Sequence, residues 1–434
     1  MRRTLRGLAA CAALACTLAG AGRAAPGLLV GMDDDTLKWA DRPSASATLA
    51  YARDLGIRAV RVTVPWRPGE TRLGVEDREP VDRMILATWA ARFRVVLAVY
   101  GRAVDAPRTD ADRDAYCTFV ASLLHRYPGV VDVVIWNEPN TARFWRPQFD
   151  EAGNSIGPAA YEALLARCYD VLHHARPGVN VIAASSPRGN NRPGSATASH
   201  SPVEFYRKLG QAYRASGRMA PIFDTIGHNP YPSRNSERPW VKHPGGTIGQ
   251  GDYDKLMAVL AEAFGGTRQP LPGQGRVSIW YMEQGFQTEV APAKAALYRG
   301  AENVRDALPP WLARTTAASF GRAAPDQATQ LTDALRMAYC QPGVAAFFNF
   351  EIADEPNLDG WQSGLLWADG TPKPSYAAFK TAVHAIASRR VDCRRYTDVA
   401  AGAEIGFTSA VAKPRPAPPA APPSPKSGST GTVK

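Results

Sequence analysis

Short apolar runs alternate with longer helical patterns through most of the chain. The runs are continuous, which is typical of strands that are buried on both faces of a parallel sheet. Eight of them are evident, at residues 28–32, 59–64, 95–100, 131–136, 179–184, 223–227, 277–282 and 344–350. Helical patterns such as 45–55, 81–91 and 161–175 separate them, and Gly or Pro often precedes the next strand.

Repeated strand–helix units predict a parallel sheet, and eight units predict a closed (β/α)8 TIM barrel, an α/β fold, as one domain over residues 26–398. An open, doubly wound sheet is the competing architecture. No glycine-rich phosphate fingerprint follows the first strand, which argues against a nucleotide-binding version of that sheet.

The two ends of the chain differ in pattern from a folded domain. Residues 1–25 begin with arginines, continue with an apolar run and end in small residues, as a secretory signal peptide does. The run is shorter than the ~20 apolar residues that a membrane span requires. Residues 399–434 are rich in Pro, Ala and Ser, which predicts a disordered tail. We therefore expect an exported protein, secreted or associated with the cell envelope and not inserted in the membrane.

Composition narrows the possible partners. The chain has 434 residues, of which 45% are hydrophobic and 21% charged, as in ordinary globular proteins. Its formal net charge is +11, but the two ends carry most of it and the predicted domain is nearly neutral. This distribution lacks the basic patch of a nucleic-acid-binding protein. No residue spacing is typical of a metal site, so we expect no metal or other cofactor, and we expect a monomer.

Four cysteines remain once the predicted signal peptide is removed: Cys117, Cys168, Cys340 and Cys393. An even number in an exported chain favours disulfide bonds. Consecutive helices are neighbours around a barrel, so we favour the pairs Cys117–Cys168 and Cys340–Cys393 among the three possible pairings. Four buried free thiols are the alternative.

Two of the predicted strands end in a glutamate with an aromatic residue close before it. Glu138 follows Trp136-Asn137, and Glu283 follows Trp280-Tyr281-Met282. A barrel carries its chemistry at the carboxyl ends of its strands. A glutamate at a buried strand end is poorly solvated, so its charged form needs cations or hydrogen bonds. Two such glutamates facing one substrate can divide the acid and nucleophile roles that cleavage of a glycosidic bond requires.

Asn137-Glu138-Pro139 after the fourth strand and Glu283 after the seventh resemble the clan-A retaining glycoside hydrolases. Within the clan, the chain looks most like the cellulase-like, bacterial secreted members of families five and thirty-nine. The resemblance covers about residues 28–390. It includes the segment 364–376, which is similar to the one leading into the last helix of those enzymes.

This resemblance implies a role for each matching residue. Glu138 would be the general acid and then the base, and Glu283 the nucleophile that forms a glycosyl-enzyme intermediate. Asn137 would bind the 2-hydroxyl of the sugar. Arg61 on the second strand and Tyr231 after the sixth would orient Glu283 and keep it ionised.

The sixth strand departs from the family pattern. Many relatives have one residue between a His and a Tyr, whereas two residues separate His228 from Tyr231. If His228 keeps the family position, it would bind a substrate hydroxyl or Glu138. With two intervening residues, either His228 is displaced or Asn229 takes its place.

Several further residues are candidates for the same site. Trp361 and Trp145 lie in predicted loops and could form aromatic platforms for a sugar ring, although a single Trp more often packs in the core. Glu351 follows the eighth strand and competes with Glu283 for the nucleophile role. Asp33, Asp34 and Asp35 are adjacent and cannot all point one way. We therefore expect at most one of them to contact a sugar.

The sequence therefore predicts a secreted retaining β-glycosidase whose partner is a carbohydrate substrate. A transglycosylase and a barrel that binds carbohydrate without catalysis are the alternatives.

Overall fold

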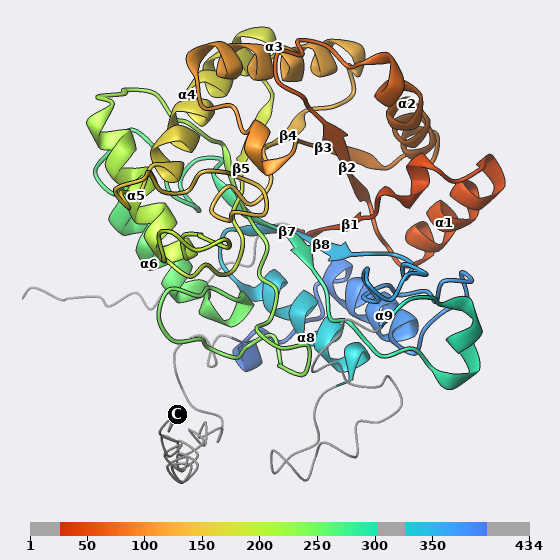
Figure 1. The fold of residues 1–434 in the computed structure, drawn as a ribbon. Helices are drawn as coiled ribbons and strands as arrows, with labels where there is room; N and C mark the ends of the chain where they lie inside the picture. Colours follow the sequence, from red (N-terminus) through yellow and green to blue (C-terminus); the bar gives the residue numbers. More distant parts are fainter. Residues whose placement is uncertain (1–26, 302–325, 397–434) are drawn as a thin grey trace, which may run out of the picture.

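The computed structural model describes residues 27–301 and 326–396. The predicted signal peptide and tail lie outside the described residues. Eight parallel strands form a closed barrel in sequence order (Figure 1). They are β1 (Leu29–Asp33), β2 (Ala59–Pro65), β3 (Arg94–Tyr100), β4 (Asp132–Ile135), β5 (Asn180–Ala183), β6 (Thr225–His228), β7 (Ser278–Gln284) and β8 (Val344–Phe350).

The barrel closes where β1 pairs with β8, in a register that runs from Leu29–Ala346 to Asp33–Phe350. This closure confirms the (β/α)8 prediction and excludes the open sheet. Figure 1 shows the helices arranged around the strands. They are α1 (Arg42–Asp54), α2 (Val75–Ala90), α3 (Asp110–Arg126), α4 (Gly157–Ala175), α5 (Pro202–Ala215), α6 (Tyr253–Phe264), α8 (Gln327–Cys340) and α9 (Ser375–Ala387). Short 3-10 helices lie at η1 (Asp35–Lys38), η2 (Ala103–Asp105), η3 (Gln250–Asp252) and η4 (Pro292–Leu297).

Helix starts follow from local capping. The side chains of Asp41, Thr109, Ser201 and Asp326 accept hydrogen bonds from backbone N–H groups in the first turns of α1, α3, α5 and α8. Such caps satisfy N–H groups that have no partner within the helix. Helix α2 begins six residues before its apolar pattern, so the sequence-based boundary at residue 81 was too late.

Side chains on the strands alternate between two cores. On β2, Val60, Val62 and Val64 pack in the large core beneath the helices, whereas Ala59 belongs to a second core enclosed by the strands. Arg61 has the same orientation as Ala59 because alternate residues share a face. The inner core ends below the carboxyl ends of the strands, and polar side chains occupy the mouth above it.

Two disulfide bonds fasten the outer layer. Cys117–Cys168 joins α3 to α4 with an S–S distance of 2.00 Å, and Cys340–Cys393 joins the end of α8 to the segment after α9 at 2.04 Å. The favoured pairing is confirmed, and the alternative of four free thiols is excluded. Within the described residues, we find no helix with the length and apolar character of a membrane span.

Candidate active site

A cavity of about 700 Å³ lies at the carboxyl ends of the strands. Every strand contributes to its wall, either with its last residues or with the loop that follows. One residue from each, in strand order, is Asp33, Arg61, Tyr100, Glu138, Ser186, Tyr231, Glu283 and Glu351. The cavity therefore brings together the two glutamates that the sequence places 145 positions apart. Asn137 and Trp361 also line it, but His228 and Trp145 do not.

Arg61 connects the groups around Glu283. Its Nη1 donates to Glu283 Oε1 at 2.9 Å and also forms an ion pair with Asp33. The Tyr231 hydroxyl donates to the other carboxylate oxygen of Glu283, Oε2, at 3.2 Å. Both oxygens of Glu283 therefore have a fixed donor, and one donor is a cation that is only 2% exposed. This environment compensates a negative charge on a buried side chain.

Arg61 also orients Asn137. Its Nη2 donates to Asn137 Oδ1 at 3.0 Å. Because the amide oxygen is engaged, the NH₂ group of Asn137 is the part available to a ligand in the cavity. This arrangement provides a hydrogen-bond donor directly beside Glu138.

Glu138 has a different environment from Glu283. Its Oε1 accepts a hydrogen bond from Asn229 Nδ2 at 2.9 Å, and no cation lies within ion-pairing distance of it among the described residues. Burial and the nearby charge of Glu283 raise the pKa of Glu138 to about 7, against the lowering effect of Asn229. At neutral pH, Glu138 thus holds a proton for a large part of the time, while Glu283 lies against a cation.

The backbone before Glu138 turns the chain into the cavity. Trp136 and Glu138 have φ angles of 63° and 38°, in the left-handed region that non-glycine residues rarely adopt. Trp136 is held there because its Nε1 donates to Phe144 O at 2.6 Å and its backbone N–H donates to the Tyr116 hydroxyl oxygen at 3.1 Å. Such conformations persist where the surroundings impose them, and they cluster at functional sites.

A register shift directs Glu283 inward. Ile279 and Tyr281 pack in the outer core, and strict alternation would give Glu283 the same outward face. The pairing of β7 with β8 shifts between Tyr281 and Gln284, so that β7 has one residue more than its partner there. Such a bulge re-aims a side chain, and Glu283 lines the cavity as a result.

Trp361 is the aromatic candidate that reaches the cavity. Its ring centroid lies 5.3 Å from that of Tyr231 and 5.1 Å from that of Phe350, and all three residues line the cavity wall. Trp145, in contrast, is 0% exposed and packs against Trp136 at 5.7 Å. It supports the turn that carries Glu138, and it is not positioned to contact a ligand.

His228 lies below the cavity as the last residue of β6. Its Nδ1 is 2.8 Å from Ser185 Oγ and its Nε2 is 2.8 Å from Ile248 O, so both ring nitrogens are engaged within the fold. Asn229, one residue later, makes the contact to Glu138. Of the two alternatives that the sequence left open, the structure therefore has Asn229 beside the glutamate.

The competing carboxylate, Glu351, also lines the cavity but has a distinct environment. It is 6% exposed, and its Oε2 has no hydrogen-bond partner. Burial, together with the charges of Asp34 and Glu355, raises the pKa of Glu351 to about 11. Glu351 is therefore neutral at physiological pH, which is unsuited to a nucleophile.

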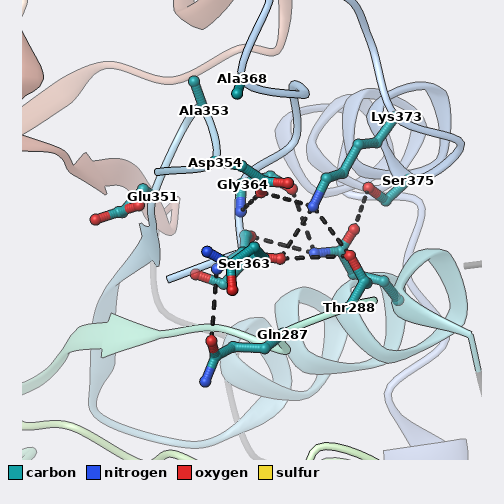
Figure 2. Close-up of polar contacts among 12 residues, drawn as sticks. Gln287, Thr288, Glu351, Ala353, Asp354, Ser363, Gly364, Ala368, Lys373 and Ser375 are labelled. Atoms are coloured by element: carbon teal, nitrogen blue, oxygen red, sulfur yellow. Dashed lines mark hydrogen bonds and ion pairs between the residues drawn. The ribbon is translucent and has the colours of Figure 1, made fainter. Parts of the chain in front are cut away.

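A buried ion pair fixes the wall that carries Glu351 and Trp361. Figure 2 shows Lys373 within a group of polar side chains, where its Nζ lies 2.6 Å from Asp354 Oδ1 and 3.1 Å from Thr288 Oγ1. Both members of the ion pair are 0% exposed. Lys373 thereby links the loops after β7 and β8, which lie side by side at the cavity rim.

Several lining residues were not singled out from the sequence. Arg143, Arg188 and Glu355 occupy the loops after β4, β5 and β8, and each lines the cavity. The sequence places these residues just after predicted strands, where site residues are expected. Solvated loop residues occupy the same positions, so this criterion alone does not identify them. Among the described residues, no group of three or more His, Cys, Asp or Glu side chains has the arrangement of a metal site.

Comparisons with known proteins identify the fold. No protein-family model and no curated protein matches the chain. Among solved structures, a β-glucosidase from Thermotoga maritima is similar, with 12% identity and a TM-score of 0.52, over 83% of this chain and 98% of that one. A GH2 β-galacturonidase from Eisenbergiella tayi gives 13% identity and a TM-score of 0.49, over 83% of this chain but only 51% of that one. This chain thus spans about half the length of the latter. At such identities the likeness establishes the barrel fold alone.

Proposed function

We propose that this protein is a secreted retaining β-glycosidase that hydrolyses O-glycosidic bonds by double displacement. The observation that carries the proposal is the unequal environment of two glutamates in one cavity. Glu283 lies against the Arg61 guanidinium at 2.9 Å, and Glu138 has a pKa raised to about 7 by burial and the charge of Glu283. Acid-assisted nucleophilic substitution requires one carboxyl group that can give a proton and a second that lies against a cation.

Each step follows from these positions. Glu138 donates its proton to the glycosidic oxygen while a carboxylate oxygen of Glu283 bonds to the anomeric carbon, and the leaving group departs as an alcohol. Glu138, now a carboxylate, takes a proton from water, whose oxygen attacks the anomeric carbon and releases Glu283. The NH₂ group of Asn137 is available to the 2-hydroxyl of the sugar, where hydrogen bonds strengthen in the transition state.

The first experiment uses aryl β-glycosides of several sugars with the full chain. We expect turnover of at least one sugar and a loss of about 10³-fold or more in Glu283→Gln, because covalent catalysis depends on that oxygen. Glu351→Gln should lose much less. Glu262→Gln, which replaces an exposed glutamate on α6, controls for the substitution itself.

A second experiment assigns the two roles. Azide added to Glu283→Ala should restore turnover and give the α-glycosyl azide, since azide then attacks from the nucleophile's side. Azide added to Glu138→Ala should give the β-glycosyl azide through the glycosyl-enzyme intermediate. The reverse pattern would exchange the roles. Sugar binding without turnover would favour a non-catalytic barrel, and products formed only with a sugar acceptor would favour a transglycosylase.

A further inference from the structure

A second cavity, of about 660 Å³, adjoins the first between the loops that follow β4 and β5. The two cavities share Thr141, Arg143 and Arg188 in their walls. Electrostatic interactions couple Glu138 to both of these arginines. The second cavity therefore opens on the side of the first where Glu138 lies.

Its wall is strongly cationic. Arg143, Arg146 and Arg188 line the second cavity, and no Asp or Glu does. Arg146 Nε donates to Ala142 O at 2.7 Å, and the other two arginines likewise contact a backbone carbonyl or a ring. In the described part of the chain, none of these three guanidinium groups forms an ion pair with a carboxylate. Three guanidinium groups around one hollow, none of them ion-paired within the described residues, create a positive potential that attracts an anion.

Carboxyl groups, rather than guanidinium groups, line the opposite end of the first cavity. Five acidic residues line this end: Asp33 at the end of β1, Asp34 and Asp35 after β1, and Glu351 and Glu355 after β8. A substrate that spans both cavities would therefore meet carboxyl groups at one end and guanidinium groups at the other. Of the two ends, the second provides the guanidinium groups that favour an anionic group.

The chemistry of Glu138 determines which part of a substrate lies at the cationic end. A general acid contacts the glycosidic oxygen, so the leaving group extends beyond Glu138, away from Glu283. The second cavity begins at this point. Guanidinium groups bind carboxylate and sulfate oxygens through paired hydrogen bonds.

We propose that the second cavity is a leaving-group subsite for an anionic substituent, a carboxylate or a sulfate ester, on the substrate. This inference rests on the proposed function and adds a substrate class to it. The three arginines act in binding, and the bond-breaking chemistry remains that of Glu138 and Glu283.

The test compares two substrates that carry the same sugar, a 4-carboxyphenyl and a 4-carbamoylphenyl β-glycoside. The measured quantity is the ratio of their kcat/KM values, in wild type and in the double variant Arg143→Gln/Arg188→Gln. Differences in leaving-group reactivity cancel when the two ratios are compared. Both arginines are exposed, so we expect the variant to fold, which its thermal unfolding will verify. Arg207→Gln on the outer helix α5 is the control.

We expect the preference for the carboxylate to fall about 10-fold in the double variant, since charge-assisted hydrogen bonds are lost. The ratio should not change in Arg207→Gln. A 4-(sulfooxy)phenyl glycoside, which carries a sulfate ester, distinguishes the two anions, and a similar fall with it supports a subsite that accepts both. An unchanged ratio, with neutral substrate still turned over, would overturn the subsite and leave the proposed function intact.

A separate outcome concerns the proposed function itself. If no sugar is turned over, the enzymatic proposal fails and the ratio is undefined. Equilibrium binding of the two aryl glycosides to wild type and to the double variant then tests the anion site directly. Tighter binding of the carboxylate that disappears in the variant supports the site, and equal binding of both compounds refutes it.

Discussion

Replacement of Asn229 offers a direct test of how the fold tunes the acid. Asn229 is 2% exposed, and its amide donates to Glu138 Oε1 at 2.9 Å. A donor to a carboxylate stabilises the charged form, so Asn229→Ala should raise the pKa of Glu138 above its value of about 7. The backbone N–H of Asn229 donates to Ser185 O at 3.0 Å in either case, which keeps the main chain in place.

The size of the effect follows from the contact. A hydrogen bond to a charged group contributes about 1.5–3 kcal/mol, and one pKa unit corresponds to about 1.36 kcal/mol, so the shift is about 1–2 units. In Asn229→Ala, water can enter the vacated space and partly replace the lost hydrogen bond, so the pKa shift should be near the lower end of this range. In Asn229→Leu the side chain fills the space, so the pKa shift should be near the upper end.

The assay is the pH dependence of kcat/KM with an aryl glycoside whose leaving group needs protonation. Glu138 acts as an acid in its neutral form, so the rate falls as pH rises through its pKa. The alkaline limb of the profile should move upward by about one unit in Asn229→Ala. Asn235→Ala, in the loop after β6 but without a contact to Glu138, is the matched control.

An alkaline limb that stays in place or moves downward would refute this reasoning. A limb that shifts equally for a 2,4-dinitrophenyl glycoside would also contradict it, because that leaving group departs without a proton. The alkaline limb would then report the pKa of another group. Asp33 is the nearest candidate, since burial raises its pKa to about 8.

Three further predictions concern stability. Arg61→Met leaves Asp33 and Glu283 buried without their cation, and we expect it to lower the free energy of unfolding, measured in urea, by about 3–5 kcal/mol; a loss below 1 kcal/mol would contradict the buried network. Removal of the Cys117–Cys168 bridge, whose cysteines are 51 positions apart, should cost up to about 4 kcal/mol by loop entropy, seen as a lower Tm in the Ala/Ala variant. His243 is paired with Asp252 and Glu237, which raise its pKa to about 9 against the opposing effect of burial. Its contribution to stability should be complete below about pH 6.5 and lost as pH rises to about 9, and a His243→Gln variant should lack this slope.

The sequence predicted the barrel because each strand and helix is encoded by local periodicity, and closure follows from counting the units. The same logic gave both disulfides, since neighbouring helices are consecutive in the chain. The direction of the side chains at the strand ends was harder to predict from the sequence. Alternation along β7 would turn Glu283 outward, and only the register shift against β8 turns it inward. The choice between His228 and Asn229 likewise depends on one residue of register, which reverses the face of a side chain.

The two disulfides affect which parts of the barrel loosen first on heating. One closes a loop that contains β4 and Glu138, and the other closes a loop that contains β8 and Trp361. The disulfides limit the movement of these two segments, whereas, among the described residues, no disulfide restrains the loops after β5 and β6. We expect warming to loosen the segments after β5 and β6 first, so that the contacts of Asn229 and Tyr231 with the two glutamates are lost before the β4 and β8 segments move.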